Sequence, residues 1–135
     1  MCHVVKISVS IPRDIHERLN SLMKEIGVDN KSKMITEAII HYLSKMRWVL
    51  GKGKIVGSIL LLYNHTRNGI VQKITDLQHD YLDIIKSTMH IHVSEELCFE
   101  SISVLGDVNR IKKLVSDLCK IKGIIKVEAC FIPIP

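Results

Sequence analysis

Hydrophobic and polar residues alternate strictly near the start of the chain. Apolar side chains occupy every second position of residues 5–11, and Lys6, Ser8 and Ser10 stand between them. A period of two is typical of a strand that buries one face and leaves the other face polar. The pattern therefore predicts a strand over these residues, with its lysine and serines on the polar side.

Two amphipathic helices are predicted next. Apolar residues recur at helical spacing from position 15 to position 26, and Gly27 then provides a stop. A second stretch with the same spacing covers positions 35 to 46, and either Asn30 or Ser32 can cap its start. The first part of the chain is thus predicted to have the order βαα.

The rest of the chain alternates strand-like and helix-like patterns. A segment rich in glycine and lysine at 51–57, GKGKIVG, has the composition of a linker that runs into a strand. The pattern beyond it predicts strands at 55–63, 84–93, 97–105 and 124–132, and helices at 69–80 and 108–121. The order βαββαβ is that of a ferredoxin-like domain. We therefore expect an α+β protein with two domains, 1–50 and 51–135.

Composition excludes some classes of protein and leaves others open. The 135 residues are 47% hydrophobic, which is enough for globular domains. No apolar run approaches the roughly 20 residues of a membrane span, and the start of the chain lacks the core of a secretion signal, so we expect a cytoplasmic location. Four cysteines without a CxxC pair fit reduced thiols. The net charge of +5 decides little about partners.

A βαα unit of about 45 residues buries too little apolar surface to be stable alone, so it is expected to dimerise. Pairing of residues 5–11 with the same strand of a second copy would satisfy both edges and bury the apolar face. The exposed Lys6, Ser8 and Ser10 would then lie on a two-stranded ribbon that fits the major groove of DNA. An edge strand with ordinary solvated polar residues is the alternative.

The segments VKISVSIP and GVDNKSKMITEAI, in this order with two helices, resemble the ribbon-helix-helix family of repressors. The resemblance covers about a third of the chain. It implies double-stranded DNA as the partner, with bases contacted by Lys6, Ser8 and Ser10. It also implies that the start of the second helix, at Lys31, Ser32 and Lys33, contacts the DNA backbone.

The stretch STMHIHVSEELCFE carries metal-binding chemistry. His90 and His92 leave the same face of a predicted strand. A turn at VSEEL would place Cys98 opposite His92, and Glu100 opposite His90, where the carboxylate could orient the imidazole. His79 is the candidate for a fourth ligand. Three imidazoles and a thiolate suit zinc, copper(II) or nickel(II), and this chemistry does not select among them.

The longer segment LQHDYLDIIKSTMHIHVSEELCFESISVLGD resembles the ACT-like regulatory domain of nickel-responsive repressors. The resemblance implies one square-planar nickel(II) per chain, bound by His90, His92 and Cys98 of one subunit and His79 of a neighbour. It also implies a homotetramer, a dimer of dimers, in which nickel promotes binding to a palindromic operator and represses nickel-uptake genes. Such a protein is not an enzyme.

One position departs from the family pattern. Many members carry an acidic residue near the position of Lys33, where it holds a further cation between the domains. The lysine puts that extra site in doubt, although Glu37 is present. Lys33 is instead expected to contact a DNA phosphate directly.

Three other functions are compatible with parts of this pattern. A ribbon-helix-helix regulator that senses an amino acid, another small molecule or another transition metal through the ACT-like domain is the strongest alternative. A small zinc hydrolase with Glu95, Glu96 or Glu100 as base is weaker, because four protein ligands leave no position for water. A plain antitoxin would not need a second folded domain.

Overall fold

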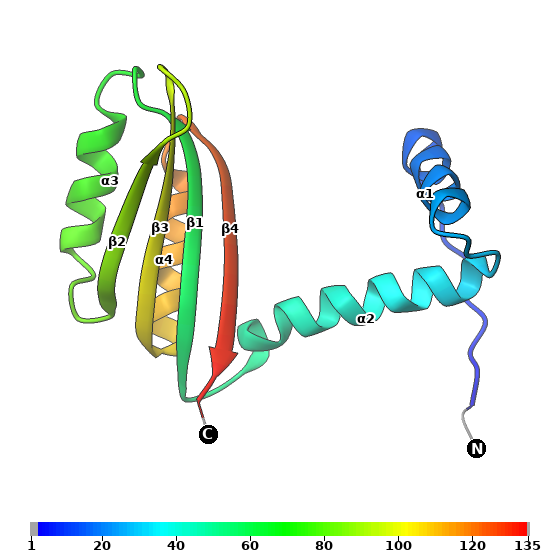
Figure 1. Ribbon diagram of the computed structural model, residues 1–135. Coiled ribbons are helices and arrows are strands. Elements are labelled where there is room, and N and C mark those ends of the chain that lie inside the picture. Colours follow the sequence, from blue (N-terminus) through cyan, green and yellow to red (C-terminus); the bar gives the residue numbers. More distant parts are fainter. Residues whose placement is uncertain (1–2, 135) are drawn as a thin grey trace. The chain divides into compact units, whose positions relative to one another are not determined.

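The computed structural model describes residues 3–134, which form two compact units (Figure 1). The first unit ends at Tyr42 and the second begins at Leu43. Cys2, one of the four cysteines, lies outside the described residues. The other three are free thiols: Cys98, Cys119 and Cys130.

The first unit contains α1 (Arg13–Glu25) and the start of α2 (Lys31–Leu50). Gly27 has a positive φ of 69°, a conformation that other residues adopt only with strain, and it ends α1 as the sequence predicts. The side chain of Asn30 accepts a hydrogen bond of 2.9 Å from the backbone of Lys33. Asn30 therefore caps α2, which confirms one of the two predicted caps.

The predicted strand at 5–11 is not formed in the single chain, where residues 3–12 are neither helix nor strand. A strand needs a second strand for its backbone N–H and C=O groups, and the described part of the chain provides none at this position. The apolar side chains here are largely exposed, with Val5 at 79% and Ile7 at 72%. Pairing with a second copy of the chain stays a prediction.

The second unit has the predicted order βαββαβ. Its elements are β1 (Lys54–Asn64), α3 (Ile70–His79), β2 (Ile85–His92), β3 (Leu97–Asp107), α4 (Val108–Lys120) and β4 (Ile124–Pro133). The four strands form one antiparallel sheet in the order β2-β3-β1-β4. This topology confirms the ferredoxin-like fold and the α+β class.

The core of the second unit lies between one face of the sheet and the two helices α3 and α4 (Figure 1). Every second residue of β3 from Cys98 to Val104 is buried, and α4 buries Ile111, Leu114 and Leu118 against this face. Asp107 accepts hydrogen bonds from the first backbone N–H groups of α4, so the predicted cap at this position is also confirmed. These contacts pack β3, the strand that pairs with β2, against α4.

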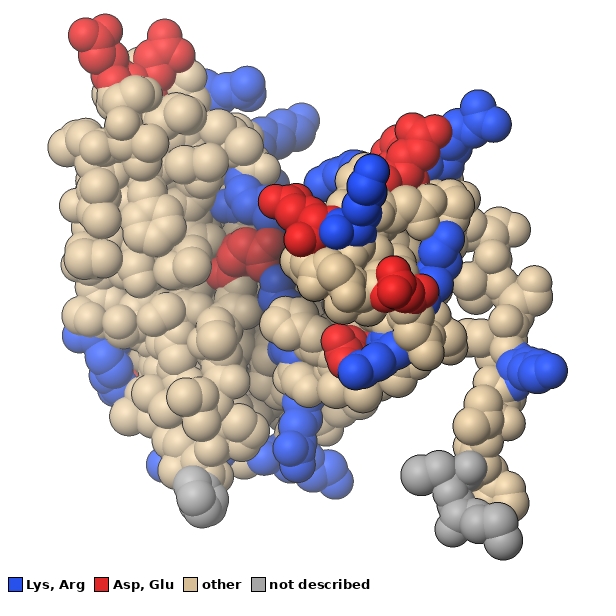
Figure 2. Space-filling model, turned by 45° about the vertical axis from the view of Figure 1, so that its right-hand side comes forward, with Lys and Arg blue, Asp and Glu red and all other residues tan. Residues whose placement is uncertain are grey.

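The opposite face of the sheet is open and apolar. The exposed apolar side chains on this face are Val56, Met89, Ile91, Leu105 and Ile132. In Figure 2 the face of the second unit that is turned to the viewer carries few lysine, arginine, aspartate or glutamate side chains. Across residues 3–134, none of the helices combines the length and the apolar character that crossing a membrane requires.

Candidate metal centre

The pairing of β2 with β3 brings three metal-binding residue types together. The antiparallel register places His92 opposite Cys98 and His90 opposite Glu100, as predicted from the sequence. Side chains of directly opposed residues leave the same face of a sheet, so all four lie on the face that the helices cover. Because β2 is an edge strand, the two histidines stand at the margin of that face.

The donor atoms of His90, His92 and Cys98 all lie within 4.8 Å of one another. Nδ1 of His92 is 3.5 Å from Sγ of Cys98, and the two imidazole rings are 5.0 Å apart between centroids. Cys98 is fully buried, whereas both histidines are exposed. The thiol therefore forms the floor of the group and the imidazoles form its rim.

This donor set fits a transition metal. Metal–ligand bonds to nitrogen and sulfur are about 2.0–2.3 Å long, so donors on opposite sides of one ion lie about 4 Å apart. The three donor atoms, which lie within 4.8 Å of one another, are close to that spacing. Imidazole and thiolate suit nickel, copper and zinc, whereas calcium and magnesium take oxygen ligands. Three protein donors leave room for at least one more ligand.

His79 is not part of this group. It is the last residue of α3 and its side chain is exposed. Among the described residues, the group of donor atoms that could share an ion contains His90, His92 and Cys98 alone. Any fourth ligand would therefore come from outside this group.

Glu100 lies on the same face as the two histidines, and its hydrogen-bond partners come from β1 and α3. It is only 5% exposed, and its two oxygens accept hydrogen bonds from the Tyr63 hydroxyl at 3.0 Å and from Nε2 of Gln78. Within residues 3–134, no hydrogen bond joins Glu100 to His90. Donors from β1 and α3 occupy the carboxylate from inside the unit, whereas His90 stands at the exposed edge. Glu100 therefore links β1 and α3 in a layer of buried polar contacts below the metal-binding side chains.

Tyr63 and Gln78 are the residues of this layer that sequence reasoning missed. Burial, together with the nearby Glu100 carboxylate, raises the pKa of Tyr63 above its ordinary value, so the phenol stays protonated and donates. The centroid of the Tyr63 ring lies 6.2 Å from that of the His90 ring. Gln78 accepts from the hydroxyl of Thr88 at 3.0 Å, which ties α3 to β2. The β1–β3 register pairs Tyr63 with Cys98, two residues before Glu100. This register would have indicated the contact between Tyr63 and Glu100.

His65 approaches the group from the loop after β1. Its Nε2 atom lies 2.6 Å from the backbone carbonyl oxygen of Glu95, and its ring centroid is 6.2 Å from that of His92. The hydrogen bond links this loop to the β2–β3 turn. His65 thus contributes to the rim of the site.

The residues predicted to contact DNA lie in the first unit. Lys6, Ser8 and Ser10 are exposed, and so are Lys31, Ser32 and Lys33. The last three form the first turn of α2, where the backbone N–H groups of a helix favour anions such as phosphate. Nζ of Lys31 lies 2.9 Å from Nε2 of His16, which connects α2 to α1.

The sequence matches one protein-family model. The match covers residues 56–132, and the model is described as the NikR C terminal nickel binding domain. The matched region contains the three residues of the donor group and His79. More than half of the chain lies within the matched region.

Curated relatives match nearly the whole chain, and each is named "Putative nickel-responsive regulator". The protein of Pyrococcus abyssi is 38% identical over 121 residues, which are 90% of this chain and 88% of that protein. The protein of Dictyoglomus turgidum is 39% identical over 124 residues, or 92% of each chain. The protein of Methanocaldococcus jannaschii is 36% identical over 129 residues, with 95% and 92% covered.

Solved structures resemble the second unit in fold. An uncharacterised protein of Thermotoga maritima has a TM-score of 0.50 at 19% identity, and the alignment covers 62% of this chain and all of that chain. The ACT domain of a GTP pyrophosphokinase from Chlorobium tepidum has a TM-score of 0.48 at 17% identity, with 56% and 97% covered.

Proposed function

The chain belongs to the family of nickel-responsive regulators, and from this membership we propose that it represses nickel-uptake genes by binding a palindromic operator when nickel is bound. It is a regulator and not an enzyme. The observation that carries the proposal is the group of His90, His92 and Cys98, whose donor atoms lie within 4.8 Å of one another. Because the protein acts on DNA, we place it in the cytoplasm.

We propose one nickel ion per chain, held by the three donors of one subunit and by His79 of a neighbouring subunit. The thiol and imidazoles are donors that suit nickel, and the exposed position of His79 at the end of α3 makes it accessible to a second copy. Bound nickel would supply a link between two subunits. The relatives' names support nickel over copper and zinc.

We further propose a tetramer, built from a core of second units and two dimers of first units. In the part of the first unit that the structure describes, Met23 is the one buried apolar residue, so its other apolar side chains need a partner. The open face of the sheet is likewise apolar and exposed. Pairing of residues 5–11 between two copies would form the DNA-binding ribbon, with Lys6, Ser8 and Ser10 toward base edges and Lys31, Ser32 and Lys33 toward the backbone.

A ligand set divided between subunits gives a physical route for control. Nickel stabilises whichever arrangement of subunits brings His79 to the other three donors. If that arrangement also sets the two ribbons at the spacing of the operator half-sites, nickel raises the affinity for DNA, and DNA raises the affinity for nickel by the same factor. The coupling needs no contact between the metal and DNA.

The experiment that tests the proposal is a nickel titration of the full chain, followed by its absorption spectrum and by operator binding. We expect one nickel per chain, a thiolate-to-metal charge-transfer band, and tighter operator binding with nickel. Cys98→Ala should remove the band, whereas Cys119→Ala, which deletes an exposed thiol on α4, should keep it. A band that survives in Cys98→Ala, or equal operator affinity with and without nickel, would overturn the proposal.

A further inference from the structure

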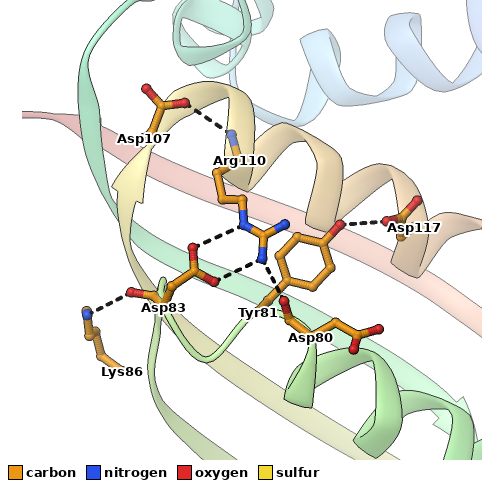
Figure 3. A network of polar contacts seen from close by, with 7 residues as sticks. All are labelled: Asp80, Tyr81, Asp83, Lys86, Asp107, Arg110 and Asp117. Atoms are coloured by element: carbon orange, nitrogen blue, oxygen red, sulfur yellow. Dashed lines mark hydrogen bonds and ion pairs between the residues drawn. The ribbon is translucent and has the colours of Figure 1, made fainter.

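The segment between α3 and β2, residues 80–84, is attached to α4 by a polar network centred on Arg110 (Figure 3). Nε of Arg110 donates to one carboxylate oxygen of Asp83 at 3.1 Å, and Nη2 donates to the other at 3.0 Å. A planar guanidinium that contacts both oxygens of a carboxylate fixes direction as well as distance. The side chains of Arg110 and Asp83 are 36% and 57% exposed, so solvent screens their charges and the contribution of the pair lies in its fixed geometry.

The same guanidinium also binds the end of α3. Nη2 of Arg110 donates to the backbone carbonyl oxygen of Asp80 at 2.6 Å. Asp80 directly follows His79, the last residue of the helix. Carbonyl groups in the last turn of a helix have no partner within the helix and carry partial negative charge, so a cation there is stabilising. Arg110 therefore caps the helix that carries His79.

Tyr81 also contacts α4, through Arg110 and Asp117. The guanidinium carbon of Arg110 lies 4.1 Å from the centroid of the Tyr81 ring, and the Tyr81 hydroxyl donates to Asp117 of α4 at 2.6 Å. Tyr81 is 2% exposed, and burial, followed by the bond to Asp117, raises its pKa to about 12. Two consecutive residues after His79 are thus held against α4.

The residue before His79 is held from the other side. Gln78 donates to Glu100 of β3 and accepts from Thr88 of β2. His79 therefore stands between two anchored neighbours, Gln78 and Asp80, while its own side chain is exposed. Since consecutive Cα atoms are about 3.8 Å apart, fixing both neighbours leaves the His79 backbone little freedom.

We propose that Arg110 is a positioning residue for His79. By capping α3 at Asp80 and tying Asp83 and Tyr81 to α4, Arg110 sets the place from which the imidazole is presented to a neighbouring subunit. The inference rests on the proposed function, in which His79 is the ligand from the second copy. Groups that orient a metal ligand typically change affinity 10- to 100-fold when they are removed.

The test compares nickel affinity in wild type, His79→Ala, Arg110→Ala and the double variant of the full chain. We expect Arg110→Ala to weaken nickel binding about 10-fold or more while the charge-transfer band from Cys98 persists at saturation. If Arg110 acts through His79, then Arg110→Ala should cost little further affinity in the His79→Ala background, because the two changes are not additive. Arg110→Lys keeps the charge but not the bidentate contact with Asp83. Its nickel affinity should therefore lie between those of the wild type and Arg110→Ala.

A matched control separates charge from position. Lys112→Ala removes one positive charge from the same helix, two residues beyond Arg110 and outside this network. Loss of a nearby positive charge by itself favours cation binding, so Lys112→Ala should leave the nickel affinity unchanged or slightly higher. A fall in affinity with Arg110→Ala alone therefore reports positioning.

Amide hydrogen exchange of the metal-free protein gives a readout that does not depend on nickel. The Ile84 and Ile85 amides bond to the Tyr81 carbonyl and should exchange at least 10-fold faster in Arg110→Ala, whereas β3 amides should be unchanged. If His79→Ala leaves nickel affinity intact, the proposed shared site fails. If His79→Ala weakens binding but Arg110→Ala does not, or if their effects simply add, Arg110 is not a positioning residue.

Discussion

Sγ of Cys98 and Nδ1 of His92 lie 3.5 Å apart across the β2–β3 pair. The register of the sheet places the two residues directly opposite each other, so two of the three donors lie side by side in the folded chain. A site that exists in the folded chain and not in the unfolded chain links metal binding to stability.

Nickel should therefore raise the melting temperature of the protein. At a free nickel concentration 100 times the dissociation constant, the expected stabilisation is about 2.7 kcal/mol, or roughly 10 °C for a domain of this size. Cys98→Ala should lose most of this shift, and a chelator should reverse it in the wild type. Thermal unfolding followed by circular dichroism measures both, and an equal nickel shift in Cys98→Ala would argue against the assigned thiol.

Gly57→Ala should disrupt the pairing of β1 with β4. A Cβ atom at this position would lie 2.1 Å from the carbonyl oxygen of Cys130 and 2.8 Å from Cα of Phe131, and both are backbone atoms that cannot rotate away. We expect a loss of about 2 kcal/mol or more in the free energy of unfolding. Gly51→Ala is the matched control, since its Cβ atom would meet nothing closer than 3.4 Å. Urea unfolding of both variants tests this, and equal midpoints would contradict it.

Acid should weaken the attachment of residues 80–84 to α4. The hydrogen bond from Arg110 lowers the pKa of Asp83, and the bonds from Tyr81 and Lys120 lower the pKa of Asp117. A carboxylate whose pKa is lower in the folded than in the unfolded state stabilises the fold above its ordinary pKa, and this stability is lost as the pH falls through the folded pKa.

The loss is therefore expected below about pH 4, the ordinary range of an aspartate. Urea unfolding of the metal-free protein between pH 6 and pH 3 should show a shallower decline for Asp83→Asn than for the wild type. Asp29→Asn, which changes an exposed carboxylate outside this network, should follow the wild type. If the stability of Asp83→Asn falls with pH as steeply as that of the wild type, the ion pair is not the source of the loss.

Lys33→Glu should weaken operator binding. Lys33 lies in the first turn of α2 and is exposed. Loss of one phosphate contact in each subunit that touches the operator reduces the slope of log affinity against log salt by about 1 per contact, and each lost contact lowers the affinity about tenfold at 0.1 M salt. Lys113→Glu, the same charge reversal on the exposed side of α4, should change little. Operator affinity measured over a series of salt concentrations tests this prediction. An unchanged slope in Lys33→Glu would show that Lys33 does not contact the DNA backbone.

Local features of the second unit could be predicted from the sequence alone. The β2–β3 hairpin joins neighbouring segments through a short turn, so alternation and turn length were sufficient to pair His92 with Cys98. Helix ends at Gly27, Asn30 and Asp107 were likewise indicated by single residues whose side chain or backbone preference acts within one helical turn.

Contacts between distant segments could not be predicted in this way. The hydrogen bonds from Tyr63 of β1 and Gln78 of α3 to the Glu100 carboxylate join three separate elements, and nothing in the local pattern around Glu100 indicates them. Arg110 meets Asp80 and Asp83 from 27 to 30 residues away. The predicted strand at 5–11 shows the same limit, because the described part of the chain offers no second strand beside it.

The sequence by itself determined the order of the elements, the donor types at His90, His92 and Cys98, and the register that brings these three together. The tertiary structure decided which layer supports them and how His79 is held at the end of α3. The physical reason is that periodicity, capping and hairpin register act over a few residues, whereas hydrogen bonds to a buried carboxylate or a helix end are available to any donor that the packed fold brings within reach.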